Sequence, residues 1–440
     1  MFAKALIGLG MSLALLGTSA AGQESALDLT QEDAVYPATE WAQAPFPAEV
    51  APVVQSLIDD AMSRELDDVM GESREIVVIH KGRLVAEAYR EGYSADTKLV
   101  SWSMAKSITQ ALVGRAVHER LIADIDQPML GLWEVEDPHA SISWRQWMTM
   151  TDGLEYAEVG ETDLAKNDVV QMMFGSGRFD VVDYALSLSQ IHEAGTHWNY
   201  STAAYHLISK ALFEKWEDYL KQSGELDYVP PTPGDLQIVE VVQSGPGCSA
   251  AMSAHLPVLK QSNIADETTA AYLLTAKKCL RTNLMNLFFF TPLGMDAQPE
   301  FDASGTFLGG SLVYASARDF ARFGYLYLRD GVWGGERLLP EGWVDFATTA
   351  HEGTDTNVYG AGWWITPPEG ETPTHSQSAK SAPYDAFHAG GNEGQTIWVV
   401  PSKDLVIVRL GLMSNAPENW AALYEWNQEV ARAFPDVAQP

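Results

Sequence analysis

The chain has 440 residues, of which 46% are hydrophobic and 20% charged, a balance typical of globular proteins. Its formal net charge is −31, from 28 basic and 59 acidic side chains. This charge argues against nucleic acid and anionic membrane surfaces as partners, because both would repel the chain.

The first 21 residues have the features of a secretory signal peptide. Lys4 precedes a short apolar run from Ala5 to Leu16, and small residues follow at positions 18–22. We therefore expect cleavage near Ala21 and an exported protein, periplasmic or secreted. The alternative is a buried N-terminal helix. No later apolar run is long enough to predict a membrane span.

Three elements are predicted after a leader over residues 22–48. Apolar residues between positions 50 and 66 recur at three- and four-residue spacing, which indicates a helix. Short apolar runs on either side of Lys81-Gly82 predict a β-hairpin over residues 76–86. Residues 103–118 again have a helical pattern.

The C-terminal part predicts a second hairpin and a closing helix. The hairpin covers residues 396–410, and the helix covers residues 415–434 with Asn415 as a possible N-cap. Hairpins near both ends with mostly helical sequence between them predict an α+β fold. We expect a single catalytic domain over residues 49–435. In it, one antiparallel sheet from both chain ends adjoins a helical lobe at roughly 120–300, with the active site between the lobes.

Residues 218–276 fit this pattern poorly and are predicted to be an insertion, either a lid or a surface elaboration. Cys248 lies in it and Cys279 follows it. In an exported protein the two cysteines either pair, which would contribute roughly 3–4 kcal/mol, or remain buried free thiols. Cys and His do not occur at metal-binding spacing, so no metal or cofactor is implied.

Ser103 and Lys106 form an S-x-x-K motif at the predicted start of a helix. A serine at this position lies near the positive end of the helix dipole. A lysine three residues later lies on the same face, so its amine can reach the hydroxyl. Partial burial would lower the lysine pKa and let the amine accept a proton. The alternative is an ordinary exposed lysine.

Two further segments have features that suit an active site. Tyr200 precedes a helical run, and a tyrosine near Ser103 and Lys106 can relay a proton to a leaving group; its pKa is expected to fall beside them. The glycine-rich segment 388–394 directly precedes the strand at 396–400. A backbone N–H from it, with that of Ser103, would form an oxyanion hole. Taken alone, Tyr200 is more simply an ordinary tyrosine before a helix, and the segment 388–394 is more simply a glycine-rich loop that leads into a strand.

The three motifs together resemble the serine β-lactamase and penicillin-binding-protein superfamily, in particular its class C β-lactamase-related hydrolases. The order S-x-x-K, Y-S-x and H-x-G, and the spacing along the chain, are those of that family. Residues 328–333 and 394–397 are most similar to its 6-aminohexanoate-dimer hydrolase branch and to related carboxylesterases. The resemblance implies a β-lactamase-like (DD-peptidase-like) fold.

The resemblance also implies roles for single residues. Ser103 matches the acylated nucleophile, Lys106 its activating partner and Tyr200 the general acid/base, and which of Lys106 and Tyr200 takes the first proton stays open. The backbone of Ser103 supplies one oxyanion N–H. The second falls on Asn392 or Gly391, depending on how the loop is aligned, and we favour Asn392.

Two departures from the family pattern bear on the substrate. His388 and Gly390 occupy the substrate-binding edge, where His388 replaces a lysine that binds the acidic group of β-lactams. Thr202 replaces the asparagine of Y-x-N. Loss of a fixed positive charge weakens recognition of anionic substrates. Tyr156 and the Trp363-Trp364 pair are further candidates for lining the cleft.

We therefore predict a serine hydrolase that cleaves a small-molecule ester or linear amide through an acyl-enzyme on Ser103. Activity on β-lactams or peptidoglycan stem peptides is the alternative within the enzyme class. A non-catalytic binding or sensor protein that keeps the fold is the alternative of another class. The sequence does not indicate an oligomeric state.

Overall fold

The computed structural model describes residues 34–37, 40–129, 131–223, 266–351, 354–367, 371–374, 383 and 385–437. The predicted signal peptide, Cys248 and most of the predicted insertion lie outside these residues. The two ends of the insertion that are described belong to helices α6 (Thr202–Ser223) and α9 (Asp266–Met285). Cys279 is buried on α9 and forms no disulfide with another described residue, so its pairing with Cys248 stays a prediction.

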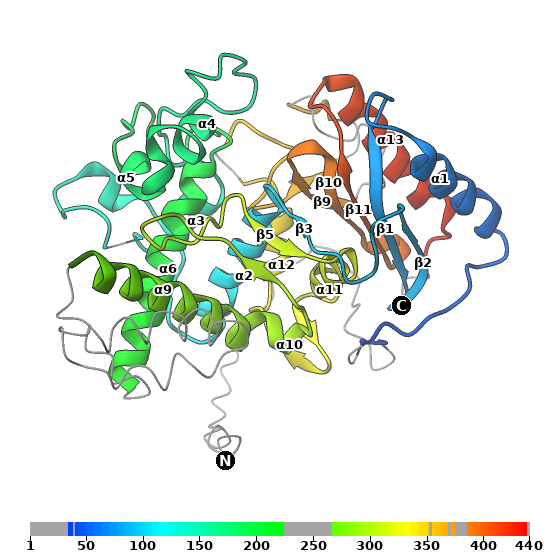
Figure 1. Cartoon of the computed structure of the whole chain (residues 1–440), viewed down its shortest axis with the longest axis horizontal. Coiled ribbons are helices and arrows are strands. Elements are labelled where there is room, and N and C mark those ends of the chain that lie inside the picture. The colour runs from blue at the N-terminus through cyan, green and yellow to red at the C-terminus, as the bar shows by residue number, and fades with distance from the viewer. Residues whose placement is uncertain are drawn as a thin grey trace, which may run out of the picture.

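A six-stranded antiparallel sheet is formed by both ends of the chain, as the sequence predicts (Figure 1). The N-terminal hairpin contributes two strands, and its first strand pairs with the last strand of the chain, with Val78 opposite Ile407. In spatial order the strands are β2 (Arg83–Tyr89), β1 (Glu72–His80), β11 (Leu405–Leu412), β10 (Gln395–Val400), β9 (Phe387–Gly391) and β8 (Trp364–Ile365).

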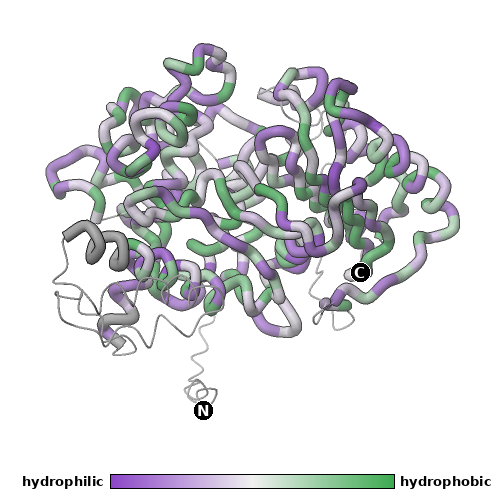
Figure 2. The backbone as a smooth tube through the Cα atoms, in the orientation of Figure 1, coloured by the Kyte–Doolittle hydropathy of each residue, from purple (hydrophilic) through white to green (hydrophobic). Residues whose placement is uncertain are grey.

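Alternation along the strands divides the sheet into two buried faces. One face packs against α1 (Ala51–Ser63) and α13 (Pro417–Ala433) through Ile76, Val78, Trp398, Val400 and Ile407. The other packs against α11 (Ala317–Leu328) through Val77, Ile79, Ile397, Val399 and Val406. Both faces are therefore covered by helices, and Figure 2 shows hydrophobic stretches in the interior and hydrophilic ones at the outer turns.

The helical lobe lies at the left of Figure 1, away from α1 and α13. It contains α6 and α9 together with α3 (Trp144–Met148), α4 (Asp168–Met173) and α5 (Val181–Leu186), and the short helical turns Pro138–Ser141, Ser176–Phe179 and Asn286–Phe290. Short elements connect it to the sheet lobe: α10 (Thr291–Leu293), the three-stranded sheet β3 (Leu99–Val100), β5 (Val313–Ala315) and β4 (Gln298–Pro299), the hairpin β6 (Val332–Trp333) and β7 (Glu336–Arg337), and α12 (Trp343–Thr348).

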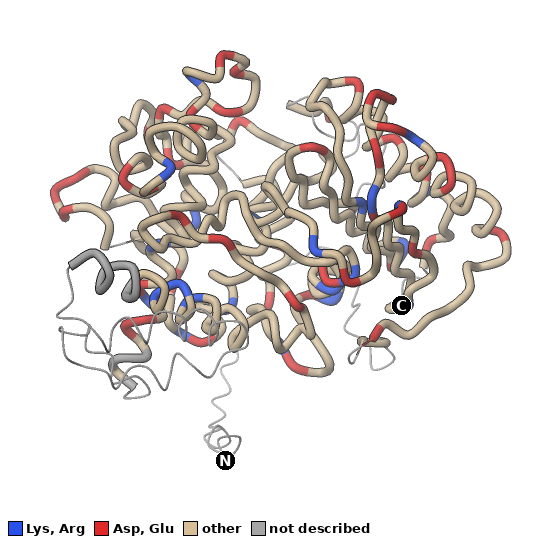
Figure 3. Tube along the Cα trace, in the orientation of Figure 1, with Lys and Arg blue, Asp and Glu red and all other residues tan. Residues whose placement is uncertain are grey.

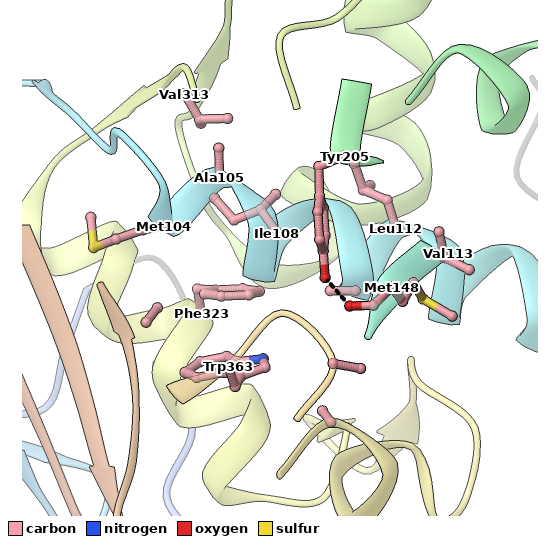
Figure 4. Close-up of a cluster of buried hydrophobic side chains, with 14 of the residues drawn as sticks. Met104, Ala105, Ile108, Leu112, Val113, Met148, Tyr205, Val313, Phe323 and Trp363 are labelled. Atoms are coloured by element: carbon pink, nitrogen blue, oxygen red, sulfur yellow. Dashed lines mark hydrogen bonds between the residues drawn. The ribbon is translucent and has the colours of Figure 1, made fainter. Parts of the chain in front are cut away.

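Helix α2 (Met104–His118) lies in the core between the two lobes. Most of its residues are buried, so it lacks the polar face of a surface helix. Figure 4 shows Ala105, Ile108 and Leu112 among side chains from several other elements. The hydroxyl of Tyr205 on α6 donates to the carbonyl of Met148 at 2.8 Å in this cluster. Residues 104–107 in the first turn of α2 are all buried, so packing holds the start of the helix in place.

The predicted N-cap of the closing helix is wrong by one residue. Helix α13 begins at Pro417, and its N-cap is Ala416 without a side-chain hydrogen bond. Proline favours the first helical position, where its fixed φ suits the helix and its missing N–H is not needed. Asn415 instead donates to Asn392 Oδ1 at 2.6 Å and accepts from the N–H of Glu393 at 3.3 Å.

Acidic side chains are spread over many surface loops, and basic ones are fewer (Figure 3). No helix among the described residues has the length and apolar character needed to cross a membrane.

Candidate active site

Ser103 lies at the N-cap of α2, and its position is fixed by the residues before it. Ser101 is held to β5, because its N–H donates to the carbonyl of Val313 at 2.8 Å and its hydroxyl accepts from the Val313 N–H at 2.9 Å. Trp102 has a φ of 44°, a left-handed conformation that is uncommon outside glycine and turns the chain sharply into the helix. The Ser103 hydroxyl makes no capping hydrogen bond. It is therefore left for other partners.

The amine of Lys106 is one partner of the Ser103 hydroxyl. Its Nζ lies 3.0 Å from Ser103 Oγ, 2.8 Å from Thr202 Oγ1 and 2.7 Å from the carbonyl oxygen of Gly310. The side chain is 1% exposed. Burial lowers the Lys106 pKa to about 8, and the negative charge of Glu158 opposes part of this effect. A substantial fraction of the amine is thus neutral slightly above neutral pH.

Tyr200 lies just before α6, with its ring beneath the Lys106 amine. Lys106 Nζ is 4.8 Å from the ring centroid. Burial raises the Tyr200 pKa, Glu158 raises it further, and a hydrogen bond with Ser103 opposes the rise. The expected fall in this pKa is therefore wrong, because desolvation of the phenolate outweighs the hydrogen bond with Ser103. The phenol holds its proton at neutral pH.

A row of stacked rings links Tyr200 to the central sheet. Tyr200 stacks on Trp364 of β8 with centroids 5.5 Å apart, Trp364 faces His388 of β9 at 6.4 Å, and His388 stacks on Trp398 of β10 at 4.8 Å. His388 is 3% exposed, and its Nε2 has no hydrogen-bond partner among the described residues. Burial lowers the His388 pKa to about 3. The imidazole is therefore neutral and supplies no positive charge at this edge.

The segment before β10 is a strand rather than a loop as far as Gly391. Gly391 lies against the residue two before the nucleophile, because a Cβ added to it would be 2.2 Å from the Ser101 carbonyl oxygen. The following turn is held at its tip, where Trp102 Nε1 donates to Glu393 Oε2 at 3.1 Å. Gly390 lies beside Trp364 and His388. Only glycine permits β9 to approach the nucleophile loop this closely.

The three aromatic residues proposed for the cleft have different surroundings. Trp364 contacts Tyr200 directly, whereas Trp363 is 0% exposed and stacks on Phe323 in the core. Tyr156 lines a pocket of about 580 Å³. The lining of this pocket does not include Ser103, Lys106 or Tyr200. We regard it as a recess of the helical lobe separate from the nucleophile.

Two groups that influence the Lys106 amine were not identified from the sequence. The Gly310 carbonyl belongs to a loop before β5. Because every residue has a backbone carbonyl, the residue type does not indicate which one contacts Lys106. Glu158 lies 44 residues before Thr202 in the chain and accepts from the Thr202 N–H at 3.0 Å and from its hydroxyl at 2.9 Å. No motif joins two positions so far apart. Thr202 itself was noted only as a departure from Y-x-N.

The arrangement combines an amine with a lowered pKa, a hydroxyl at a helix N-terminus and a protonated phenol. These are the groups of nucleophilic catalysis with separate proton acceptor and donor. Among the described residues, no group of three or more His, Cys, Asp or Glu side chains is placed to hold a metal ion.

Comparison with known proteins relates the chain to a wider family. A family model described as Beta-lactamase matches residues 64–224 and 250–431. An uncharacterized protein of Alkalihalophilus pseudofirmus is 29% identical over 115 residues, which are 24% of this chain and 32% of that protein. The chain thus spans about a third of this curated relative.

Three solved structures have a similar fold. A Bacillus anthracis protein provisionally named a 6-aminohexanoate-dimer hydrolase has a TM-score of 0.58 at 19% identity, covering 91% of this chain and 88% of that one. An octameric penicillin-binding protein homologue of Pyrococcus abyssi has a TM-score of 0.51 at 14% identity, covering 85% and 76%. A Bacillus halodurans penicillin-binding protein has a TM-score of 0.50 at 14% identity, covering 84% and 98%. At these identities the likeness concerns the fold.

Proposed function

Because the chain belongs to the Beta-lactamase family and has its serine hydrolase-like fold, we propose that it cleaves an ester or linear amide through an acyl-enzyme on Ser103. The observation that carries this proposal is the hydrogen bond of 3.0 Å between Lys106 Nζ and Ser103 Oγ. It joins a buried amine with a pKa near 8 to a hydroxyl that caps nothing.

Lys106 takes the first proton in this mechanism. The neutral amine accepts the hydroxyl proton of Ser103 as Oγ attacks the substrate carbonyl, and a tetrahedral intermediate forms with negative charge on the carbonyl oxygen. The raised pKa of Tyr200 argues against a phenolate base in the free enzyme. Of the two orders left open by the family resemblance, we therefore propose lysine first.

Two backbone N–H groups hold the oxyanion, those of Ser103 and Asn392. The Thr366 N–H donates to the Ala386 carbonyl at 3.2 Å, so the Ala386 carbonyl faces β8. The N–H and C=O groups of successive residues in a strand point alternately to its two sides. The backbone groups of Gly390 and the N–H of Asn392 therefore point to the same side of β9 as the Ala386 carbonyl. The backbone groups of Gly391 point to the other side, toward β10. This alternation favours Asn392 over Gly391. Loss of one such donor costs about 2.7–4 kcal/mol of transition-state stabilisation in other enzymes.

Tyr200 gives its proton to the leaving group as the carbonyl reforms. The alkoxide or amine leaves protonated, and the Lys106 ammonium returns a proton to the phenolate, so no net charge is left on either side chain. Water then attacks the acyl-enzyme by the reverse sequence of proton transfers and releases the acid.

The neutral His388 supports esters and linear amides without an acidic group next to the scissile bond over β-lactams and stem peptides. A β-lactam carries an acidic group, which needs a fixed positive partner to bind well. His388 offers none, since burial among Trp364 and Trp398 keeps it uncharged. We propose that this edge of β9 contacts the substrate through the Gly390 backbone.

A fluorophosphonate probe tests the nucleophile. The purified protein should be labelled once, on Ser103, and Ser103→Ala should lose the label while keeping the melting temperature of the native protein. The matched control is Ser107→Ala, one turn further along α2, which removes a hydroxyl bonded to the Gly362 carbonyl at 2.6 Å. Persistent labelling of Ser103→Ala, or no labelling of the native protein, would contradict the proposal and favour a non-catalytic binding protein.

A substrate panel tests the class. Rates on p-nitrophenyl esters of increasing chain length and on a linear aminohexanoate dimer should exceed the rate on nitrocefin. Rapid nitrocefin turnover without ester or linear-amide hydrolysis would reverse this order and favour a β-lactamase.

We also propose that the protein is exported, on the basis of the charged and apolar residues at positions 4–16. Expression of the full chain followed by N-terminal sequencing of the mature protein should find a start near position 22. A mature protein that still begins at Met1 in the cytoplasm would contradict export without affecting the proposed chemistry.

A further inference from the structure

Lys106 has three hydrogen-bond partners, and their donor and acceptor character decides what its amine can do. An ammonium group has three N–H donors and fits three acceptors. After losing one proton, the amine has two N–H donors and one lone pair. The Gly310 carbonyl, 2.7 Å away, can only accept. Ser103 and Thr202 both carry hydroxyls, which can donate or accept. What the amine can do therefore depends on whether the Thr202 hydroxyl donates to it or accepts from it.

Glu158 removes this freedom. Its two carboxylate oxygens accept from the Thr202 hydroxyl at 2.9 Å and from the Thr202 N–H at 3.0 Å. A carboxylate without a proton cannot donate, so the hydroxyl proton of Thr202 points to Glu158. Its remaining lone pairs face the Lys106 amine, 2.8 Å away. The loop that carries Glu158 is itself held, since Asn167 Nδ2 donates to the Glu158 carbonyl at 3.0 Å.

We propose that Glu158 is a positioning residue that makes Thr202 an obligate acceptor, so that the neutral amine of Lys106 turns its lone pair toward Ser103. Both N–H groups of the neutral amine are then directed at Thr202 and Gly310. The lone pair of the amine must then point toward Ser103 Oγ, the third partner. The inference rests on the proposed acyl-enzyme function, in which Lys106 takes the proton of Ser103.

Glu158 also has a structural role, which the test must separate. Thr202 is the first residue of α6, so the carboxylate satisfies a free N–H at a helix start. Glu158→Gln keeps this bond, because the amide oxygen takes the place of one carboxylate oxygen. Its NH₂ group then faces Thr202 Oγ1 and donates to it. The Thr202 hydroxyl must reverse and offers its proton to the Lys106 lone pair, in competition with Ser103.

The experiment is a double-mutant cycle of Glu158→Gln and Thr202→Val, read from the pH-independent plateau of kcat for an ester. Glu158→Gln should lower the plateau by roughly tenfold to a hundredfold, which is part of the roughly 10²–10⁴-fold that a positioned general base contributes, with KM little changed. Thr202→Val removes the hydroxyl, so adding Glu158→Gln to it should lower the plateau no further. Asp163→Asn, which removes an exposed charge from the same loop, is the control and should leave the plateau unchanged.

Two opposite effects of Glu158→Gln distinguish orientation from charge. Removing the negative charge should lower the Lys106 pKa, since Glu158 raises it, and so move the rise of activity to lower pH. A pure charge effect would therefore increase activity near neutral pH, whereas reversal of the hydroxyl lowers the plateau. An unchanged plateau, or an equal loss in the Thr202→Val background, would overturn the inference.

The Lys106 titration can be followed without turnover, by NMR of protein labelled at lysine Cε. A lower Lys106 pKa in Glu158→Gln than in the native protein shows that the charge of Glu158 acts on the amine, so that a lowered plateau in the same variant reports the direction of the Thr202 hydroxyl. An identical titration contradicts the proximity on which the inference is built. Failure of the native protein to label on Ser103 would instead contradict the proposed function, so the two failures are distinguishable.

Discussion

Burial lowers the pKa of Lys106 to about 8, and the negative charge of Glu158 opposes only part of this effect. The same burial acts in the opposite direction on Tyr200, whose ionised form is the charged one, and keeps it protonated. At the residue scale, one physical cause thus separates an acceptor from a donor of protons. This separation is what a two-step acyl transfer requires.

The pH dependence of acylation follows from the Lys106 pKa. The active form is the neutral amine, so kcat/KM should rise with pH and reach a plateau above about pH 8. Lys106→Arg keeps the charge but cannot lose its proton, and it should reduce kcat/KM by about 10²–10⁴. Rates on a p-nitrophenyl ester across the pH range check both. A profile that is flat from about pH 6 to about pH 9 would contradict Lys106 as the base.

At the element scale, the helices of the sheet lobe are held by close contact with the strands. Helix α11 carries Gly324 at the point of nearest approach, where an added Cβ would be 2.7 Å from Ile397 Cγ2 and 2.8 Å from Val406 Cγ1. Both contacts are with branched side chains of buried central strands. The side chains of Ile397 and Val406 have little room to move, because the protein interior around them is closely packed.

Gly324→Val should therefore destabilise the protein by about 1–3 kcal/mol through overpacking. The expected measurement is a lower midpoint of urea unfolding. Ala421→Val on the exposed face of α13 is the control, and it should change the free energy of unfolding by less than about 1 kcal/mol. Equal effects of the two substitutions would show that α11 does not pack tightly on β10 and β11.

The junction of α11 with β1 contains a buried carboxyl group. Glu75 is 0% exposed, and its Oε2 accepts from the Ala317 N–H at the start of α11 at 3.0 Å. Burial raises the Glu75 pKa to about 7, and the bond from Ala317 opposes part of the rise. Because the folded state holds the proton more tightly than the unfolded state, stability is lost as pH rises from about 4.5 to about 7.

Glu75→Gln removes this loss, since an amide has no proton to release and can still accept from Ala317. The variant should gain stability relative to the native protein, on the order of 2 kcal/mol, between about pH 5 and about pH 8. Urea unfolding at the two pH values measures the difference. Glu49→Gln, at an exposed position, should show no such change. A constant difference between Glu75→Gln and the native protein at both pH values would contradict the prediction.

At the scale of the whole molecule, acidic residues outnumber basic ones by 59 to 28. Figure 3 shows acidic residues distributed along the described chain in both lobes. Repulsion among them opposes the compact state, and dissolved salt screens it beyond a Debye length of about 10 Å at 0.1 M.

Raising NaCl from about 0.05 M to about 0.5 M should therefore increase the melting temperature at neutral pH. Surface ion pairs act against this trend, but each contributes only about 0–1 kcal/mol. Melting curves in NaCl and in an equivalent concentration of a neutral osmolyte separate screening from general solvent effects. A melting temperature that falls with NaCl would mean that the ion pairs outweigh the net charge.

The sequence pattern was sufficient for α2 and for strands β1, β2, β10 and β11 of the sheet, whereas β8 and β9 were not predicted. The strands around Lys81-Gly82 and on either side of residues 401–404 are short apolar runs bounded by turn residues, which predicts hairpins, and both hairpins are present. The start of α13 was misjudged because Asn415 and Ala416 are neighbours, and the local sequence does not reveal that Asn415 bonds to the turn after β9.

In the candidate site too, some features could be predicted from the local sequence and others could not. Ser103 and Lys106 are one helical turn apart, so the helix itself brings their side chains together, and local sequence was enough to predict the pair. The direction of the Tyr200 pKa, the neutral state of His388 and the contact of Glu158 with Thr202 all depend on segments distant in the chain. Burial and charge act through space, so only the tertiary structure decided them.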